Sequence, residues 1–357
     1  MLLSFMACKK DKDNDDAEKN NKVIGIYAGA QFSMFIKADN SLWATGRNDY
    51  GQLADGATAH IYTPKLVMND VAAVSSGSAH TMILKTDKTL WGVGYNSGGQ
   101  LGDNTTQTSA SPKQIMTDVS AISTSINQTF AIKTDKTLWA MGHNYYGELG
   151  DGTTQMVKIP KQIMADVLTV SAAYNYTLIL KTDHTLWATG VNEYGKFGDG
   201  TTTNSTIFKF IMSGVKAINT TIDASLILKD DNTLWAVGAN PTGKLGDGTY
   251  DNISIPKQIM ANVATMSSMT HHTLILKTDG TLWATGDNRA GQLSVGTMAM
   301  INSPQLVTDK VKSISAGTDH SIILKTDHSV WLTGYNVYGQ LGDQADKSRY
   351  ILKELKF

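Results

Sequence analysis

Short apolar segments recur along the chain with polar turns between them, and each repeated unit contains four of them. In the second unit they lie at residues 72–75, 81–85, 90–93 and 113–116. Segments such as Leu-Trp-Ala-Thr-Gly alternate their side chains as a β-strand does, and no unit shows the 3.6-residue period of an amphipathic helix. A polar Thr-Asp-x-Thr turn at 86–89 joins the second segment to the third. The pattern predicts four short antiparallel strands per unit.

Tryptophan marks the period of this pattern. The seven Trp residues lie 48 residues apart, at Trp43, Trp91, Trp139, Trp187, Trp235, Trp283 and Trp331. A Gly follows each Trp by three residues, an Asn by five, a second Gly by eight and a Leu or Phe by ten. Self-similarity at a fixed period is the signature of a repeat protein. We therefore divide the chain into a leader, residues 1–22, and seven units that fill residues 23–357.

This repeat predicts an all-β, seven-bladed β-propeller with four antiparallel strands in each blade. The Trp supplies the large apolar contact that each blade needs against its neighbour, and the Leu ten residues later inserts between adjacent sheets. A cofactor-binding or light-sensing cluster of Trp is the less favoured alternative. The final segment, residues 351–357, takes the place of the fourth strand in the last blade, which must close the ring against the first.

The repeat also resembles that of a known family. Residues 80–104, HTMILKTDKTLWGVGYNSGGQLGDN, and 320–343, HSIILKTDHSVWLTGYNVYGQLGD, are similar to the repeat of the regulator of chromosome condensation. The resemblance covers residues 23–357 and implies the seven-bladed propeller. Family members include a guanine-nucleotide exchange factor, a plant ultraviolet photoreceptor and bacterial propellers, so the fold does not decide the function. The short, regular units favour the bacterial branch.

Composition narrows the function classes. Charged residues make up 18% of the chain, the net charge is -1, and there are 32 Gly, 6 Pro and 1 Cys. A balanced charge gives no general attraction to nucleic acid, and we expect none as a partner. A single Cys excludes an intramolecular disulfide framework and a Cys-rich zinc site. No run of 18 apolar residues predicts a transmembrane helix.

The leader, residues 1–22, reads MLLSFMACKKDKDNDDAEKNNK. The segment before Cys8 resembles the end of a bacterial lipoprotein signal, in which the Cys is acylated, and the charged stretch after it predicts a solvated tether. The apolar part is shorter than a complete signal peptide requires and lacks a basic start, so we infer that the true start lies upstream. We thus expect a lipid anchor on Cys8, at the bacterial outer membrane or cell surface. The alternative is a cytosolic protein with a frayed N-terminus.

No catalytic, metal-binding or cofactor-binding motif occurs in the chain, so we predict a protein that is not an enzyme and has no cofactor. Asp recurs twelve residues after Trp in six units, from Asp55 to Asp343, and six equivalent copies indicate turn caps. The residue eleven before Trp is His in three units, at His80, His272 and His320. We interpret these histidines as structural hydrogen-bonding residues, with a metal site at the pair His271–His272 as the weaker alternative.

One end of the predicted ring carries the loops that vary most between units, namely those between the first and second and between the third and fourth strands. We call this end the loop face. Variable loops on a rigid scaffold are the usual place for binding sites, and Tyr and Arg are enriched at interface hot spots. The candidate partner-binding residues are Tyr50, Tyr95, Tyr145, Tyr146, Tyr174, Tyr176, Tyr194, Tyr335, Tyr338, Arg47 and His143.

These observations predict a non-enzymatic, monomeric binding propeller whose loop face holds a protein or a glycan. The first alternative is a nucleotide-exchange regulator of a small GTPase, as the family resemblance allows. The second is a hydrolase or lyase with a site at the propeller axis, for which the sequence shows no acid/base pair. A third reading of the loop tyrosines is purely structural, since they also cover the edges of the blades.

Overall fold

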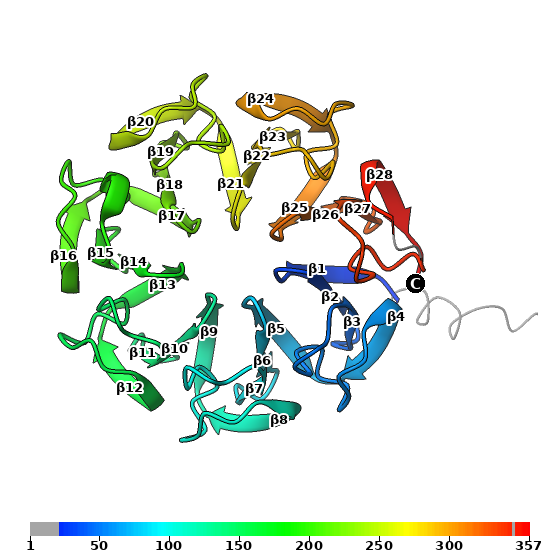
Figure 1. Ribbon diagram of the computed structural model, residues 1–357, viewed down its shortest axis with the longest axis horizontal. Coiled ribbons are helices and arrows are strands. Elements are labelled where there is room, and N and C mark those ends of the chain that lie inside the picture. The colour runs from blue at the N-terminus through cyan, green and yellow to red at the C-terminus, as the bar shows by residue number, and fades with distance from the viewer. Residues whose placement is uncertain (1–20, 345–346) are drawn as a thin grey trace, which may run out of the picture.

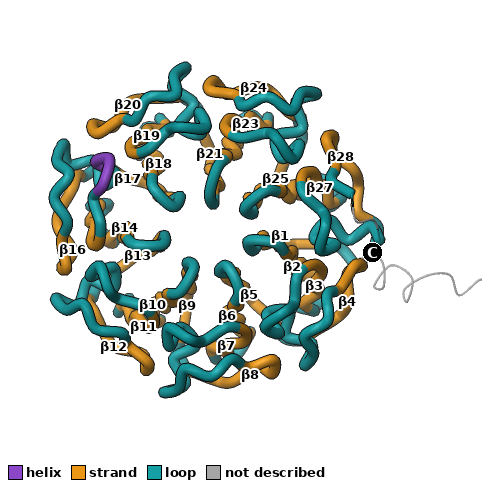
Figure 2. The backbone as a smooth tube through the Cα atoms, in the orientation of Figure 1, coloured by secondary structure: helices purple, strands orange, loops and turns teal. Residues whose placement is uncertain are grey.

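The computed structural model describes residues 21–344 and 347–357, and they form a ring of seven four-stranded antiparallel sheets (Figure 1). The strands of each sheet follow one another in the sequence and in space. The only helix in these two ranges is the 3₁₀ turn η1 (Glu193–Gly195), which lies among the loops of the fourth blade (Figure 2). The predicted all-β, seven-bladed propeller is confirmed.

The strands have nearly the same lengths in every blade. Blade 1 holds β1 (Val23–Ala28), β2 (Phe32–Lys37), β3 (Leu42–Gly46) and β4 (Ile61–Met68); blade 2 holds β5 (Val71–Ser76), β6 (His80–Lys85), β7 (Leu90–Gly94) and β8 (Ser109–Met116); blade 3 holds β9 (Val119–Thr124), β10 (Gln128–Lys133), β11 (Leu138–Gly142) and β12 (Val157–Met164). Blade 4 holds β13 (Val167–Ala172), β14 (Tyr176–Lys181), β15 (Leu186–Gly190) and β16 (Ser205–Met212); blade 5 holds β17 (Val215–Thr220), β18 (Ala224–Lys229), β19 (Leu234–Gly238) and β20 (Ile253–Met260). Blade 6 holds β21 (Val263–Ser268), β22 (His272–Lys277), β23 (Leu282–Gly286) and β24 (Ile301–Thr308); blade 7 holds β25 (Val311–Ala316), β26 (His320–Lys325), β27 (Val330–Gly334) and β28 (Arg349–Leu355).

The fourth strand of each blade is longer than the sequence pattern predicts. In blade 2 it begins at Ser109, four residues before the expected start at residue 113, because Gly94 at the end of β7 pairs with Ser109. The ladder shifts register between Gly92 and Gly94, and this irregularity hides the first half of the strand from a simple apolar pattern. The same early start and register shift recur in the other blades, as in the pairing of Gly190 with Ser205.

The hydrophobic core lies between the blades, with one cluster at each of the seven seams. The cluster between blades 1 and 2 joins Phe32 and Leu53 to Ile83 and Val93, and Trp91 packs against it. Six of the seven Trp residues pack against such a cluster in this way. The Leu or Phe ten residues after each Trp is at most 3% exposed. These contacts confirm the structural roles predicted for both positions.

The repeated loop after Trp is organised by an Asn and an Asp. In blade 1 the Asn48 amide oxygen accepts the backbone N–H of Leu53 at 2.9 Å, and its NH₂ group donates to Asp55 at 3.0 Å. Asp55 also accepts Lys65 Nζ at 2.9 Å. The equivalent Asn accepts the same backbone bond in all seven blades. The predicted turn-capping role of the recurring Asp is therefore confirmed.

The two ends of the ring are distinguished by their connections. At one end the β2–β3 turn meets the link to the next blade, since Val71 N donates to Asn40 O at 2.9 Å. At the other end, the loop face, the β1–β2 and β3–β4 loops meet, since Arg47 N donates to Gln31 O at 3.0 Å. Both bonds recur around the ring, which places the variable loops together at one end as expected.

Blade 7 closes the ring against blade 1 with the same contacts that join the other blades. The Ser33 hydroxyl donates to Gln340 O at 2.7 Å across this seam. Equivalent bonds from a Ser or Thr hydroxyl cross the other six seams at 2.6 to 2.8 Å. The chain end adds Phe357, whose ring lies 5.1 Å from that of Phe35. The seven seams thus share one design, and the first and last blades meet at one of them.

Candidate partner site on the loop face

The exposed tyrosines among the predicted residues gather on two neighbouring blades. Tyr145 is 65% exposed, Tyr146 43%, Tyr174 36% and Tyr194 43%. Tyr145 and Tyr146 follow β11 in blade 3, and Tyr174 and Tyr194 belong to the loops of blade 4. The rings of Tyr146 and Tyr174 lie 6.4 Å apart and so bridge the two blades. The predicted binding residues therefore form their most accessible group on blades 3 and 4.

The other predicted residues are less accessible. Tyr50 and Tyr95 are half-buried against each other, with ring centroids 4.9 Å apart, and Tyr335 and Tyr338 are also half-buried. Arg47 is half-buried and forms an ion pair with Asp49. The remaining candidate, His143, is half-buried beside Tyr145.

Tyr176 differs from the rest because it lies in the core with 0% of its surface exposed. Its hydroxyl donates to Ala224 O at 2.5 Å, across the seam to blade 5. Burial raises the pKa of the Tyr176 phenol far above its ordinary value. The expectation that Tyr176 contacts a partner is corrected on this point: it occupies the repeat position of His80, and its side chain points into a seam.

In blades 2, 6 and 7, two buried repeat positions hold the same residue types, and the first of them is a His that bonds across the seam. The imidazole Nε2 of the His eleven residues before Trp bonds the hydroxyl that crosses the seam, as His80 does with Thr129 at 3.1 Å. His272 and His320 do the same with Ser321 and Ser33. Burial lowers the pKa of His80 and His272 to about 4 and that of His320 to about 3. All three are therefore neutral at neutral pH, and their bonds across the seams confirm the structural hydrogen-bonding role that the sequence analysis predicted.

The second common position lies nine residues after Trp. It is Gln in blades 1, 2, 6 and 7, where the side-chain oxygen accepts the backbone N–H of the residue two before it, at 2.9 to 3.1 Å. In blades 3, 4 and 5 this buried position holds Glu148, Lys196 and Lys244 instead. The His position is also altered there, to Gln128, Tyr176 and Ala224. We call these six residues, with the loops that carry them, the divergent sector.

In blade 3 the sector buries a carboxylate. Glu148 is 0% exposed and accepts the backbone N–H of Tyr146 at 2.7 Å, which preserves the bond that Gln makes elsewhere. Its other oxygen accepts Gln128 Nε2 at 3.0 Å and lies 3.0 Å from His143 Nδ1. The buried charge is therefore held by three hydrogen-bonding groups, which is the condition for burying a charge at moderate cost. It also connects the core directly to the loop that bears the exposed tyrosines.

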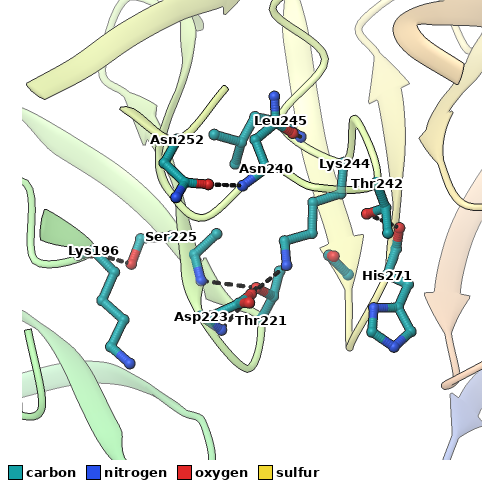
Figure 3. A network of polar contacts seen from close by, with 12 residues as sticks. Lys196, Thr221, Asp223, Ser225, Asn240, Thr242, Lys244, Leu245, Asn252 and His271 are labelled. Atoms are coloured by element: carbon teal, nitrogen blue, oxygen red, sulfur yellow. Dashed lines mark hydrogen bonds and ion pairs between the residues drawn. The ribbon is translucent and has the colours of Figure 1, made fainter. Parts of the chain in front are cut away.

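Blades 4 and 5 each bury an ammonium group at the same position. Lys196 is 1% exposed and donates to Asn175 Oδ1 at 2.9 Å, while its Nζ lies 4.7 Å from the centre of the Tyr176 ring. Lys244 is also 1% exposed and forms an ion pair with Asp223. Figure 3 shows Lys244 reaching Asp223, whereas the Lys196 side chain ends away from that carboxylate. Burial lowers the pKa of Lys196 to about 8, and it lowers that of Lys244 against the attraction of Asp223.

A cavity of about 350 Å³ opens on the ring axis beside these loops. It is lined by the ends of the innermost strands and by the β1–β2 type loops of all seven blades, and small hydroxyl residues such as Ser75, Ser123 and Ser171 predominate. Among the residues that the structure describes, no charged side chain belongs to its lining. An axial acid/base pair, which the hydrolase or lyase alternative requires, is thus missing from the cavity wall.

The described residues also lack two other features. No group of three or more His, Cys, Asp or Glu side chains suited to a metal ion occurs in residues 21–344 and 347–357. Within the same part of the chain, no helix has the length and apolarity needed to cross a bilayer. The predicted lipidation site, Cys8, lies outside the described residues.

Sequence reasoning missed the buried half of the site. The aromatic loop residues were recognised, but Glu148, Lys196 and Lys244 were not singled out, although aligning the units on Trp shows them replacing a Gln. Exposed Tyr250, on the β19–β20 loop of blade 5, was also missed. Comparison of equivalent repeat positions was the signal that could have found the three charged residues, because four of the seven blades define the common residue.

Comparison with known proteins agrees with this architecture. A family model described as the RCC1-like domain matches residues 6–267, and models of the regulator of chromosome condensation (RCC1) repeat match residues 279–324 and 311–340. No curated protein matches the chain. Among solved structures, Prp20p from Saccharomyces cerevisiae is 17% identical with a TM-score of 0.80, covering 96% of this chain and 89% of that one.

Two further solved structures show the same likeness. Yeast RCC1 (Prp20) in complex with Kap60 is 16% identical with a TM-score of 0.79, over 100% of this chain and 91% of that one. Human WBSCR16 is 20% identical with a TM-score of 0.77, over 86% of this chain and 87% of that one. At these identities the likeness shows the fold.

Proposed function

The chain belongs to the RCC1-like domain family, and from this premise we propose that it is a non-enzymatic binding propeller whose loop face holds a protein partner. The observation that carries the proposal is the group of four exposed tyrosines on blades 3 and 4, Tyr145, Tyr146, Tyr174 and Tyr194. They stand on loops whose bases are fixed by hydrogen bonds, including Ala173 N to Tyr176 O at 2.9 Å below Tyr174, so the aromatic side chains are presented by a rigid frame.

The chemistry of this group favours a protein over a glycan. Tyr side chains provide large contact areas with a polar tip at a low entropic cost, and they are enriched at the energetic centre of protein interfaces. Glu148 is buried beneath this surface and accepts the backbone N–H of Tyr146, so it fixes the loop that carries Tyr145 and Tyr146. A glycan remains the alternative ligand class and would be distinguished by the binding experiment below.

The experiment is a pull-down with the full chain, followed by affinity measurements on the partner it identifies. Replacing Tyr145, Tyr146, Tyr174 and Tyr194 by Ala should weaken binding by more than about tenfold, as the loss of interface hot spots does. The matched control replaces Tyr62 and Tyr350, which are 43% and 47% exposed but lie on the outer strands β4 and β28. Equal affinity of the two variants for the partner would refute the proposed site.

We also propose that the propeller is tethered outside the cytoplasm by a lipid on Cys8, in a bacterial member of the family. The proposal rests on the lipoprotein-like segment and on the charged stretch that follows it. Metabolic labelling with a palmitate analogue, using the gene with its upstream sequence, should label the wild type but not Cys8→Ala. Equal labelling of both, or labelling of neither, would contradict the anchor while leaving the binding proposal untouched.

A second candidate function is regulation of a small GTPase. It is favoured by the extent of the structural likeness to Prp20p, a protein described with its binding to Gsp1p and histones. The candidate predicts that the full chain accelerates release of a fluorescent guanine nucleotide from a small GTPase of the same organism. A release rate unchanged by the propeller across the GTPases of that organism would exclude it.

A further inference from the structure

Blades 4 and 5 each bury a lysine in the same arrangement, but its partner is an amide in blade 4 and a carboxylate in blade 5. Lys196 and Lys244 occupy one repeat position, and each reaches the residue that lies 21 positions before it. In blade 5 that residue is Asp223, whose carboxylate pairs with Lys244. In blade 4 it is Asn175, whose amide oxygen accepts Lys196 Nζ at 2.9 Å. Asn has the shape of Asp without its charge, so blade 4 holds the cation of this pair and lacks the anion.

The Lys196 ammonium is therefore poorly compensated. A protonated lysine has three N–H donors, and the contacts found for this one are the Asn175 oxygen and the face of the Tyr176 ring. No carboxylate lies within ion-pair distance of Lys196 among residues 21–344 and 347–357. Asp223 and Glu193 attract it from farther away, while Lys244 repels it. Buried charges in proteins are ordinarily paired, so this one is an exception that calls for a partner.

The ring has no structural need for a lysine here. Gln at the equivalent position of four blades stays neutral and satisfies a backbone N–H of its loop. Lysine cannot accept that bond, because an ammonium group is only a donor. The loop of blade 4 accordingly lacks the capping oxygen, and Tyr194 at its tip has a φ of 61°, in the left-handed region. Lys196 thus gives up a loop hydrogen bond and buries a charge at the same time.

We propose that Lys196 is a binding site for an anion. A carboxylate from outside the chain pairs with Lys196 Nζ in blade 4, as the Asp223 carboxylate pairs with Lys244 in blade 5. On the β13–β14 loop Asn175 is half-buried and its neighbour Tyr174 is exposed, so we place the approach of the carboxylate at this loop. An incoming carboxylate replaces the Asn175 oxygen at Nζ. Because Tyr174 belongs to the proposed partner surface, the natural source is an acidic side chain of the protein partner. This assignment of the source rests on the proposed function, whereas the anion site itself does not.

The test uses the full chain and acetate, with lysine Cε atoms labelled for NMR and sodium chloride as the ionic-strength control. In the wild type, acetate should raise the melting temperature and shift the Lys196 titration toward the ordinary pKa of lysine. In Asn175→Asp, the new carboxylate should raise the pKa of Lys196 without acetate, and acetate should no longer raise the melting temperature. Lys196→Gln restores the common residue of the repeat, so it should fold and should lack the response.

Blade 5 supplies a converse variant. Asp223→Asn removes the carboxylate from Lys244 and creates a second open site, so this variant should respond to acetate more strongly than the wild type. Inorganic phosphate serves as a second probe, and a response to phosphate that exceeds the response to acetate would overturn the assignment to carboxylates. An acetate response in Lys196→Gln or Asn175→Asp equal to that of the wild type would overturn the site altogether.

The partner gives an independent result. If Lys196 is the acceptor for the partner's acidic side chain, Asn175→Asp should weaken partner binding by about tenfold or more, as like-charge juxtaposition does. Unchanged partner binding, together with a lost acetate response, would overturn the partner as the source while the anion site stands. Failure of the tyrosine variants to weaken binding would instead overturn the proposed function, so the two failures are distinguishable.

Discussion

Blades 2, 6 and 7 and the divergent sector of blades 3 to 5 share one backbone design but treat two buried positions differently. In blades 2, 6 and 7, a neutral His bonds across each seam and a neutral Gln caps the loop, as His320 and Gln340 do in blade 7. In the divergent sector the His position contains Gln128, Tyr176 and Ala224, and the Gln position contains the buried side chains of Glu148, Lys196 and Lys244. The difference teaches that the ring can be built without these charges, so their presence in three consecutive blades is consistent with the binding role proposed above.

The sector also shows how a seam survives substitution. In blade 4 the hydroxyl of Tyr176 reaches Ser225 Oγ at 3.1 Å and Ala224 O, replacing the imidazole bond of the other blades. In blade 3, Gln128 reaches across to Tyr174 O at 3.0 Å. The hydroxyl-to-carbonyl bond persists at every seam, including Ser225 to Lys196 O at 2.6 Å. The seams are conserved in geometry while the residues that surround them vary.

The largest expected effect comes from breaking a seam outside the sector. Replacing His320 by Ala removes a fully buried ring and its bond to Ser33, at the seam that closes the circle. The free energy of unfolding should fall by about 2 to 4 kcal/mol, the usual cost of a core cavity combined with a lost buried hydrogen bond. Chemical denaturation at pH 7 measures it. Replacing the exposed His184 by Asn, which tolerates its left-handed φ of 65°, is the control and should change stability little. A loss no larger than that of the control would show that the histidine seams are not structural.

The next effect has the opposite sign and belongs to the sector. Lys196→Gln should stabilise the ring by about 1 to 3 kcal/mol at pH 7, since removing a poorly paired buried charge relieves its desolvation cost. Burial lowers the folded pKa of Lys196 to about 8 from an ordinary value of 10.5. Below pH 8 the lysine is charged in both the folded and the unfolded state, and the folded state bears the full cost of burying the charge. Between pH 8 and 10.5 the folded protein has released this proton while the unfolded chain still binds it, so the cost falls steadily and vanishes only near pH 10.5.

The stabilisation by Lys196→Gln should therefore be constant below pH 8 and should shrink as the pH rises toward 10.5. Denaturation curves of the two proteins at a series of pH values provide the measurement. Gln100→Lys, in blade 2, is the matched reverse change and should destabilise the ring over the same pH range. A stabilisation independent of pH would mean that packing, and not charge, separates the two kinds of blade.

The sequence predicted the repeated features of this fold well, because each structural role appears seven times. The roles of Asp55 and Leu53 follow from their fixed distances to Trp43, and the structure confirms them. The fourth strand was predicted too short because a register irregularity interrupts its pattern. Repetition averages out chance substitutions, so common positions were predicted more reliably than individual ones.

The site was harder to predict because it depends on departures from the repeat. Tyr174 and Tyr176 lie two residues apart and share one residue type, but one is exposed at the loop tip and the other fills a seam. Their different burial follows from the His position that Tyr176 occupies, which the sequence shows. The absence of a carboxylate beside Lys196 could not be predicted in this way, because only the fold shows that the Lys196 side chain lies next to Asn175. Contacts of this kind need three-dimensional coordinates.

The smallest expected effect tests whether the two kinds of blade differ only at the positions named. Lys113 in blade 2 and Lys161 in blade 3 make the same ion pair, with Asp103 at 2.5 Å and Asp151 at 2.6 Å. Burial raises the pKa of Asp103, but hydrogen bonds from Lys113 and Thr105 outweigh it and lower the pKa to about 2. The lysines are themselves well exposed. Lys113→Ala and Lys161→Ala should each cost no more than about 1 kcal/mol at pH 7, because each lysine is exposed and each Asp keeps its bond from a Thr hydroxyl.

The two costs should also be equal, because this pair is part of the repeat and not of the sector. Thermal melts of the two variants, in low salt and in high salt, provide the comparison, and screening by salt should reduce both effects together. A markedly larger loss in Lys161→Ala would show that blade 3 differs from blade 2 beyond its buried residues. In that case the loop of blade 3 would be coupled to Glu148 and His143, and the sector would act as one unit rather than as separate substitutions.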